Sequence, residues 1–327
     1  MNRYFLVLAS SIISVILCGL LTIPMLKRVK AGQTILKYVD VHKDKNGTPT
    51  MGGLFFVIPS IIVFFIFNGA NGRIAIVSTV IGLAYMLVGF LDDYLKIKFK
   101  QNEGLKAYQK IFFQLGIALV AGFFAYYNGI TVFHLPFTLK NVDLGVLTIP
   151  IVSLIFIAIT NCVNLTDGLD GLAGSVSLIY LFLMTIIISL QMQTLKNYYI
   201  KSEEYHSLNL LSVSLMGGIL GFLVFNTNRA SIFMGDTGSL SLGGFIGAIS
   251  IFSSNSFFIP IIGIMFVLSG ISVIVQVTYF KFTKKRVFLM APLHHHFQLA
   301  GHSESKIVYG YSLVTLFCGL SLILVYL

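Results

Sequence analysis

The sequence has few charged residues and few cysteines for its length, and each shortage excludes a class of protein. Aspartate, glutamate, lysine and arginine together make up 10% of its 327 residues, whereas soluble domains contain about 25%. A soluble globular domain is therefore excluded. The three cysteines lie far apart inside apolar runs, so no disulfide and no cysteine metal site is expected. No G-x-x-x-x-G-K-[ST] phosphate loop occurs, which excludes a P-loop hydrolase.

Apolar residues are abundant instead, at 56% of the chain. They recur in runs of roughly 18 to 22 residues, long enough to cross a hydrocarbon core of ~30 Å. The first run lacks a small-residue cleavage site, so it is predicted to be a retained helix and not a signal peptide. The eighth run is rich in glycine and the ninth begins with Pro260, so both are expected to be broken or tilted. We predict an all-α integral membrane protein, one polytopic domain over residues 1–327, with ten spans at about 4–26, 52–68, 74–91, 110–127, 146–162, 175–191, 208–225, 239–253, 257–280 and 307–327.

The basic residues are distributed unevenly between two sets of loops. Ten spans place both termini on one side of the membrane, and 17 of the 22 lysines and arginines fall on the other side. Because basic residues accumulate in cytoplasmic loops, that side is predicted to be cytoplasmic and both termini extracytoplasmic. Nine of the 12 acidic residues also fall there, so an active-site cleft is predicted to face the cytoplasm. The net charge of +10 is thus explained by membrane orientation, and no nucleic-acid partner is expected.

Three acidic clusters lie at the ends of predicted spans. Asp92 and Asp93 end the third span in FLDDYLK, Asp167 and Asp170 follow the fifth in NLTDGLDGLAG, and Asp236 precedes the eighth in FMGDTG. Each has a simple structural alternative: a solvated helix end, a polar turn, or a helix N-cap. However, carboxylates at a helix C-terminus or at membrane depth are costly and usually functional. Several carboxylates on one face, among lysines, suit a magnesium ion that handles a phosphorylated substrate.

Two further motifs lie in the predicted cytoplasmic loops. APLHHHFQ contains His294, His295 and His296, which cannot all bind one ion from a single helical turn. We interpret them as donors to a phosphate or sugar, a role that protonation near neutral pH would strengthen, against simple loop polarity. In KDKNGTPTMGG, a helix N-cap at Thr48 and a phosphate contact through Lys45 remain equally open.

Five motifs occur in the same order as in the phospho-N-acetylmuramoyl-pentapeptide transferases, a branch of the polyprenyl-phosphate hexose-1-phosphate transferases. They are GTPTMGG, DDYLK, NLTDGLDGLAG, FMGDTGSLSLGG and PLHHHF, and the resemblance extends over roughly residues 27–310. It implies a Mg²⁺-dependent enzyme of peptidoglycan biosynthesis in the bacterial cytoplasmic membrane. Such an enzyme transfers phospho-N-acetylmuramoyl-pentapeptide from UDP-MurNAc-pentapeptide to undecaprenyl phosphate, giving lipid I and UMP. The resemblance also implies a homodimer.

The same resemblance implies roles for the acidic residues and the histidines. Asp236 matches the metal-binding aspartate, with Asp167, which matches an acid needed for activity, as a second candidate ligand. Asp92 and Asp93 match a catalytic pair, in which Asp92 would deprotonate or orient the lipid phosphate. The three histidines match a loop that faces the sugar and the pyrophosphate.

Other matched positions are implied to contact the substrate. Asp170 and the backbone of two neighbours match a uracil pocket, in which an aromatic residue stacks on the base and two asparagines order the loop. Further residues match contacts on the substrate side, and one lysine is placed near a phosphate. Gly168 and Leu169 are the two neighbours, Phe233 is the aromatic residue, and Asn164 and Asn226 are the two asparagines. Lys45, Thr50 and Gln276 match the contacts on the substrate side, and Lys110 is the lysine near a phosphate.

The chain departs from the family pattern at several positions. Arg229 stands where the family usually has proline, Gln298 where it has glutamate, His302 where it has tryptophan, and Gly310 where arginine is common; the G-P-x-x-H ahead of Lys45 is missing, although its histidine, His42, remains. These departures affect the expected loop and lipid-side geometry but remove none of the carboxylates. Two alternatives stay open: a UDP-N-acetylhexosamine polyprenyl-phosphate sugar-1-phosphate transferase, and an ion- or proton-coupled transporter, whose acids would lie nearer the middle of spans.

Overall fold

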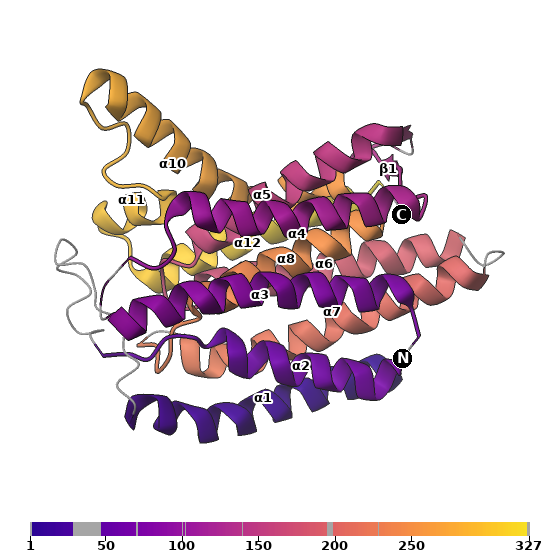
Figure 1. Cartoon of the computed structure of the whole chain (residues 1–327), viewed down its shortest axis with the longest axis horizontal. Coiled ribbons are helices and arrows are strands. Elements are labelled where there is room, and N and C mark those ends of the chain that lie inside the picture. The colour runs from indigo at the N-terminus through magenta and orange to yellow at the C-terminus, as the bar shows by residue number, and fades with distance from the viewer. Residues whose placement is uncertain are drawn as a thin grey trace.

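The chain folds into a bundle of long helices in a computed structural model (Figure 1). The structure describes residues 2–28, 47–69, 71–99, 101, 103–138, 140–194, 199–227 and 229–325. The helices are α1 (Asn2–Arg28), α2 (Gly53–Asn68), α3 (Arg73–Phe99), α4 (Ala107–Tyr127), α5 (Thr148–Thr166), α6 (Leu172–Thr194), α7 (Tyr199–Asn226), α8 (Gly235–Phe252), α9 (Ile259–Ile262), α10 (Ile264–Thr283), α11 (Leu293–Leu299) and α12 (Glu304–Ile323), with short 3₁₀ turns at Gly145–Leu147 and Ser256–Phe258.

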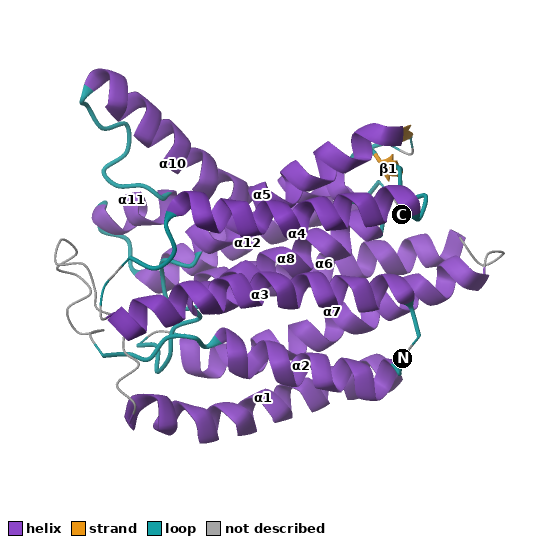
Figure 2. Cartoon of the chain, viewed as in Figure 1, coloured by secondary structure: helices purple, strands orange, loops and turns teal. Residues whose placement is uncertain are grey.

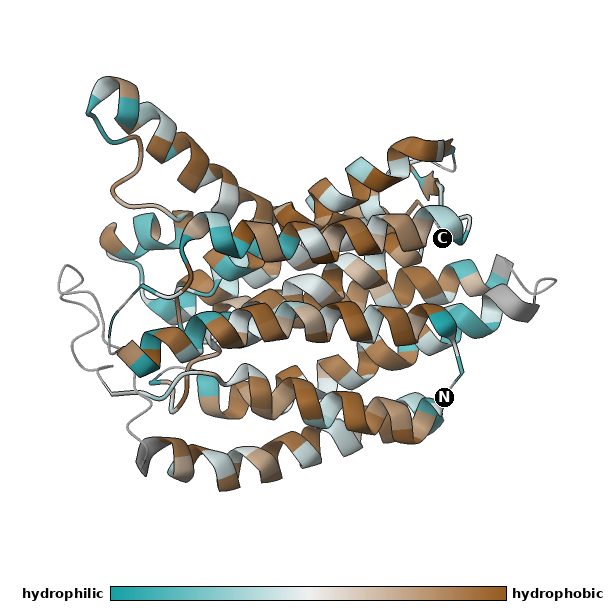
Figure 3. Ribbon diagram, viewed as in Figure 1, coloured by the Kyte–Doolittle hydropathy of each residue, from teal (hydrophilic) through white to brown (hydrophobic). Residues whose placement is uncertain are grey.

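Eight helices in the described part of the chain are long and apolar enough to cross a membrane. Their ribbons, coloured by residue hydropathy, are brown along most of the bundle and teal mainly near its two ends (Figure 3). Apolar side chains at exposed positions, such as Phe112 and Phe317, are what a lipid-facing surface requires. The eight are α1, α3, α4, α5 with its preceding 3₁₀ turn, α6, α7, α10 and α12.

The central helix is α8, which is surrounded by protein. Every residue from Thr237 to Phe252 is buried, and α8 packs against α2, α3 and α5. Its many glycines and serines let neighbouring backbones approach closely, as in other membrane bundles. The expectation of a break in this segment is wrong, because α8 is one unbroken helix.

The predicted ninth span is interrupted, as Pro260 led us to expect. Pro260 lies in the first turn of the four-residue helix α9, and the chain turns at Gly263 before α10 begins. The all-α prediction missed one feature: β1 (Val132–His134) and β2 (Asn141–Asp143) form a short antiparallel pair beside the α4–α5 connection (Figure 2). The register pairs Phe133 with Val142, and Phe133 is fully buried.

The two ends of the bundle differ in what they carry. The N- and C-termini lie at one end, together with the strand pair, the last turn of α6 and the first turn of α7 (Figure 1). The last turns of α3, the first turn of α4 and the helix α11 lie at the opposite end, and α10 projects away from the bundle there. All three acidic clusters are therefore gathered at the end opposite the termini.

Candidate active site

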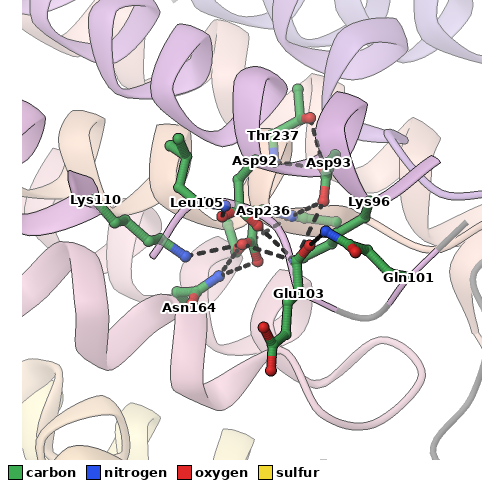
Figure 4. Close-up of polar contacts among 12 residues, drawn as sticks. Asp92, Asp93, Lys96, Gln101, Glu103, Leu105, Lys110, Asn164, Asp236 and Thr237 are labelled. Carbon is green, nitrogen blue, oxygen red and sulfur yellow. Dashed lines mark hydrogen bonds and ion pairs between the residues drawn. The ribbon is translucent and has the colours of Figure 1, made fainter. Parts of the chain in front are cut away.

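Three carboxylates from two helices meet at that end of the bundle. Asp92 and Asp93 lie in the last turns of α3, Asp236 lies in the first turn of α8, and their nearest oxygens are all within 4.8 Å of one another (Figure 4). They meet because α3 and α8 pack together along their lengths.

Asp93 caps the N-terminus of α8. One of its oxygens accepts a hydrogen bond from the Asp236 backbone N–H at 3.2 Å, and the other accepts two from Thr237, at 2.9 Å from N and 2.7 Å from Oγ1. A carboxylate at this position also interacts favourably with the helix dipole. The Asp93 side chain is thus fully engaged in holding Asp236 in place, which separates its role from that of Asp92.

Gly235 makes this close approach possible. Its φ is +71°, a left-handed conformation that favours glycine. An added Cβ would lie 2.5 Å from Asp93 Oδ2 and 2.7 Å from Thr50 Oγ1. The structure therefore brings Thr50, a predicted substrate contact that is almost fully buried, beside the acidic cluster.

Asp236 is where four helices meet. Its Oδ1 accepts a hydrogen bond from Asn164 Nδ2 of α5 at 2.7 Å, and its Oδ2 is 2.8 Å from Lys110 Nζ of α4 and 3.1 Å from Lys96 Nζ of α3. The Asn164 amide donates to Asp236 and to the Ser239 hydroxyl, and the role expected for Asn164 in a uracil pocket stays a prediction. Lys110, predicted to lie near a phosphate, is held at the acidic cluster.

Lys96 lies among all three carboxylates and was missed as a site residue. Its Nζ is 2.6 Å from Asp92 Oδ2, 3.1 Å from Asp236 Oδ2 and 3.8 Å from Asp93 Oδ1 (Figure 4). The signal was present in DDYLK, since residues three and four apart face one another on a helix. The other Asp92 oxygen accepts the Leu105 backbone N–H at 2.9 Å. Three carboxylates thus share two ammonium groups.

The donor set fits a magnesium ion. Magnesium takes oxygen ligands, commonly one or two carboxylates together with substrate phosphates. The Asp236 side chain is 16% exposed, against 4% for Asp92 and 1% for Asp93, so Asp236 is the member best placed to bind an ion and a substrate together. In the described part of the chain, Asp167 is not among the clustered carboxylates, and its place as a second ligand is not supported.

Asp167 lies instead at the C-terminal cap of α5, half-buried. Burial raises the pKa of its carboxyl to about 8, and the negative charges of Asp236, Asp93 and Asp170 add to the shift. The cap position also faces the negative end of the α5 dipole. Asp167 is therefore suited to hold a proton near neutral pH, whereas a carboxylate that binds a metal ion directly is ionised.

Asp170 and Asn226 join two loops. Asp170 Oδ2 accepts the Ala230 backbone N–H at 3.0 Å. The Asn226 side chain accepts the Gly171 N–H at 3.0 Å and donates to the Ile232 carbonyl at 2.9 Å. The segment after Asp167 is thus tied to the segment before Asp236. Asn226 thus holds these two loops together, and the uracil pocket predicted for Asn226 and Asp170 stays a prediction.

The loop before α8 also carries Phe233 and Arg229. Phe233 is half-buried, and its backbone binds Pro49 and Gly52, which brings the GTPTMGG segment to the same place. Arg229 has φ +64°, which proline cannot adopt because its ring fixes φ near −65°. Arg229 therefore has a backbone conformation that the proline expected here from the resemblance does not adopt.

The three histidines of α11 have different surroundings. His294 is fully buried, and its two ring nitrogens have no hydrogen-bond partner among the described residues. Burial lowers the pKa of His294 to about 3, so protonation does not strengthen a donor role for this residue near neutral pH, and its contact with a phosphate or sugar stays a prediction. His295 contacts the Gln298 side chain at 3.1 Å, and His296 Nδ1 accepts the Leu289 backbone N–H at 3.2 Å.

His294 packs directly on the NLTDGLDGLAG loop. A Cβ added to Gly168 would lie 2.2 Å from His294 Nε2. We expect Gly168→Ala to push this ring away and to lower activity about tenfold or more, because overpacking a filled site costs about 1–3 kcal/mol. The measurement is the transfer rate of the purified variant beside His294→Ala. As a control, the variant that combines Gly168→Ala with His294→Ala should be no less active than His294→Ala alone. A fully active Gly168→Ala enzyme would contradict this packing.

The predicted substrate contacts of Gln276 and Lys45 both stay predictions. The Gln276 side chain accepts the backbone N–H groups of Val287 and Phe288, both at 3.0 Å, and donates to the Phe288 carbonyl at 3.2 Å. It thereby fixes the segment between α10 and α11. Lys45 lies outside the described residues, so its contact stays a prediction.

Comparison with known proteins decides the family. The family model described as glycosyl transferase family 4 matches residues 74–254, and the phospho-N-acetylmuramoyl-pentapeptide-transferase signature 1 matches residues 45–57. A protein of that name from Caldanaerobacter subterraneus subsp. tengcongensis is 40% identical, and the match covers 92% of each chain. The chain belongs to the phospho-N-acetylmuramoyl-pentapeptide-transferase family.

Other members of this family match as extensively. The phospho-N-acetylmuramoyl-pentapeptide-transferase of Acetivibrio thermocellus is 42% identical over 95% of this chain and 91% of its own length. The one from Clostridioides difficile is 40% identical over 92% of this chain and 91% of its own. The glycosyl transferase family 4 match begins in α3 and ends just after α8, so it includes all three clustered carboxylates.

Proposed function

We propose that this chain transfers phospho-N-acetylmuramoyl-pentapeptide from UDP-MurNAc-pentapeptide to undecaprenyl phosphate, forming lipid I and releasing UMP. The observation that supports this most strongly is the cluster of Asp92, Asp93 and Asp236 with two lysines in a member of this family. Phosphoryl transfer needs little covalent chemistry from the protein and depends on positioning and on charge stabilisation. Buried carboxylates and ammonium groups at one point supply both.

In this proposal Asp236 is the residue that binds Mg²⁺, and the ion would neutralise the charge that develops on the pyrophosphate. Lys110 and Lys96, now paired with Asp236, become donors to phosphate oxygens when substrate enters. Asp93 holds the first turn of α8 in place. Asp92 lies beside Lys96 and is the candidate base for the lipid phosphate.

Two groups at the α5–α6 loop, Asp167 in the loop and His294 of α11 packed on it, suit the other half of the substrate. Asp167 holds a proton near neutral pH and therefore adds no charge against the pyrophosphate. His294, neutral and without a partner among the described residues, offers one donor and one acceptor to the sugar–phosphate. The loops joined by Asp170 and Asn226, with Phe233, form the proposed uracil site.

We place the acidic end of the bundle at the cytoplasmic face and both termini outside. The lysines and arginines gathered at that end favour this orientation. Ten membrane-crossing segments would result if α2, of 16 residues, and the enclosed helix α8 also cross. A homodimer is proposed from the family alone.

An exchange assay with two sugar donors tests the proposal. Purified chain with Mg²⁺ and undecaprenyl phosphate is given UDP-MurNAc-pentapeptide or UDP-GlcNAc, and released UMP and lipid-linked sugar are measured. We expect product from the muramoyl donor alone, lost with chelator. Product from UDP-GlcNAc would overturn the sugar assignment, and no product from either donor would return the transporter to consideration.

The raised pKa of Asp167 predicts a pH-dependent stability. Because its folded-state pKa is about 8, above the unfolded value, its stabilising contribution is fully present at low pH and lost as pH rises through about 8. In chelator, the melting temperature of the detergent-solubilised chain should fall more between pH 6 and pH 9 than that of Asp167→Asn. Parallel curves for the two proteins would contradict this environment for Asp167.

A further inference from the structure

A cavity of about 300 Å³ lies between α10, α11 and α12, and the proposed reaction does not use it. Sites that bind small molecules begin at about this volume. Its walls are almost entirely apolar. They are formed by Met265 of α10, Phe297 of α11, and Ile307, Tyr311 and Val314 of α12.

The cavity has two basic side chains at its polar end. His302 and Lys306 complete its lining, and both are exposed. The acid nearby in sequence, Glu304, accepts a hydrogen bond from the Gln298 side chain at 3.4 Å, toward α11. An apolar cavity with basic groups at one end matches a ligand with an apolar chain and an anionic head.

The surroundings point to the lipid bilayer as the source of this ligand. On α12, large apolar side chains next to the cavity are exposed, with Tyr309 65%, Leu313 45% and Phe317 76% accessible. Lys306 lies in the first turn of α12, at the end of the bundle where basic residues gather. Anionic lipid headgroups at a membrane surface attract basic residues in this position.

Gly310 of α12 also lines the cavity. A Cβ at Gly310 would meet no described atom within 4 Å, so this wall is open. Gly310 and His302 are two of the positions at which the sequence departs from the family pattern. Arg229 and Gln298, two of the other departures, do not line it.

We propose that this cavity binds one acyl chain of an anionic phospholipid, whose phosphate is held by Lys306 and His302. The ligand would lie close to the candidate active site. Tyr311 lines the cavity, and its ring centroid is 6.5 Å from that of His294, which packs on Gly168. Occupancy would keep Tyr311 and α11 packed in the arrangement that places His294.

Native mass spectrometry of the purified full chain, titrated with phosphatidylglycerol or phosphatidylcholine of the same acyl chains, tests the proposal. We expect tighter binding of phosphatidylglycerol, and a loss of about fivefold in that affinity in Lys306→Gln, the effect of one basic residue on an anionic headgroup. Lys306→Arg should retain it. Gly310→Leu fills the cavity and should weaken the binding of both lipids by at least the fivefold expected for Lys306→Gln.

Two matched controls separate this site from general effects. Lys281→Gln removes an exposed lysine from the same end of the bundle, and Gly116→Leu adds the same side chain at a helical glycine that also has no described atom in the way. Both should bind phosphatidylglycerol as the unchanged protein does. Equal losses in Lys281→Gln and Lys306→Gln, unchanged binding in Gly310→Leu, or displacement of phosphatidylglycerol by undecaprenyl phosphate would overturn the proposal. If Gly310→Leu does not fold, the comparison of Lys306→Gln with Lys306→Arg decides.

Discussion

Replacing Asp236 by asparagine is expected to lower the transfer rate by about a thousandfold or more. The substitution keeps the shape of the side chain but removes the charge that Lys96, Lys110 and Asn164 converge on. A loss of this size corresponds to about 4 kcal/mol of transition-state stabilisation, within what a metal ion and its carboxylate contribute. The measurement is UMP release at saturating concentrations of both substrates.

Asp143→Asn is the matched control for that prediction. Asp143 is an exposed aspartate of β2, at the end of the bundle that carries the termini. The Asp143→Asn variant should keep full activity. That result would show that removing a carboxylate elsewhere does not lower activity as Asp236→Asn does. An Asp236→Asn enzyme within tenfold of the unchanged protein would remove Asp236 from the reaction.

Replacing Asp93 by asparagine is expected to destabilise the protein and to inactivate it for a different reason. Asn Nδ2 would face the Thr237 backbone N–H, so a strong cap would become a contact between two donors. Hydrogen bonds to a charged group contribute about 1.5–3 kcal/mol each, and we expect a loss of about 2–3 kcal/mol. The measurement is thermal unfolding in detergent, beside activity.

Thr237→Val gives the graded comparison. It removes the Thr237 hydroxyl, whose oxygen is 2.7 Å from Asp93, but leaves both backbone N–H groups capped. Its unfolding temperature should lie between those of the unchanged protein and Asp93→Asn. If Asp93→Asn is inactive but as stable as the unchanged protein, Asp93 acts on the substrate and not through α8.

The helical character of the chain was predictable from the sequence. The described part of each predicted span is mostly helical, because long apolar runs leave few other choices for a backbone in lipid, but eight described helices are long and apolar enough to cross and the ninth predicted span is interrupted at Gly263. The acids were correctly expected at one end, since they lie at span ends on the same side. The strand pair after α4 was missed, because three-residue strands such as Val132–His134 give almost no periodic signal.

Side-chain partners could not be read from spacing alone. Asn164 lies in the same motif as Asp170, which suggested a shared role, yet α5 turns its amide toward Asp236 on another helix. Asp92 and Asp93 look equivalent in the sequence, but adjacent positions on a helix point about 100° apart. Asp93 therefore caps the backbone N–H groups of the first turn of α8, whereas Asp92 reaches only the Asp236 side chain there. The neutral state of His294 depends on burial by Gly168 and Tyr311, which are distant in sequence.

Mn²⁺ binding followed by electron paramagnetic resonance tests most directly whether Asp236 and its neighbours form a divalent cation site. Mn²⁺ stands in for Mg²⁺, and the signal of the free ion falls as the protein binds it. We predict one tightly bound ion per chain, competed by Mg²⁺, lost in Asp236→Asn and retained in Asp143→Asn. Equal binding by the unchanged protein and Asp236→Asn would contradict the assignment of the site.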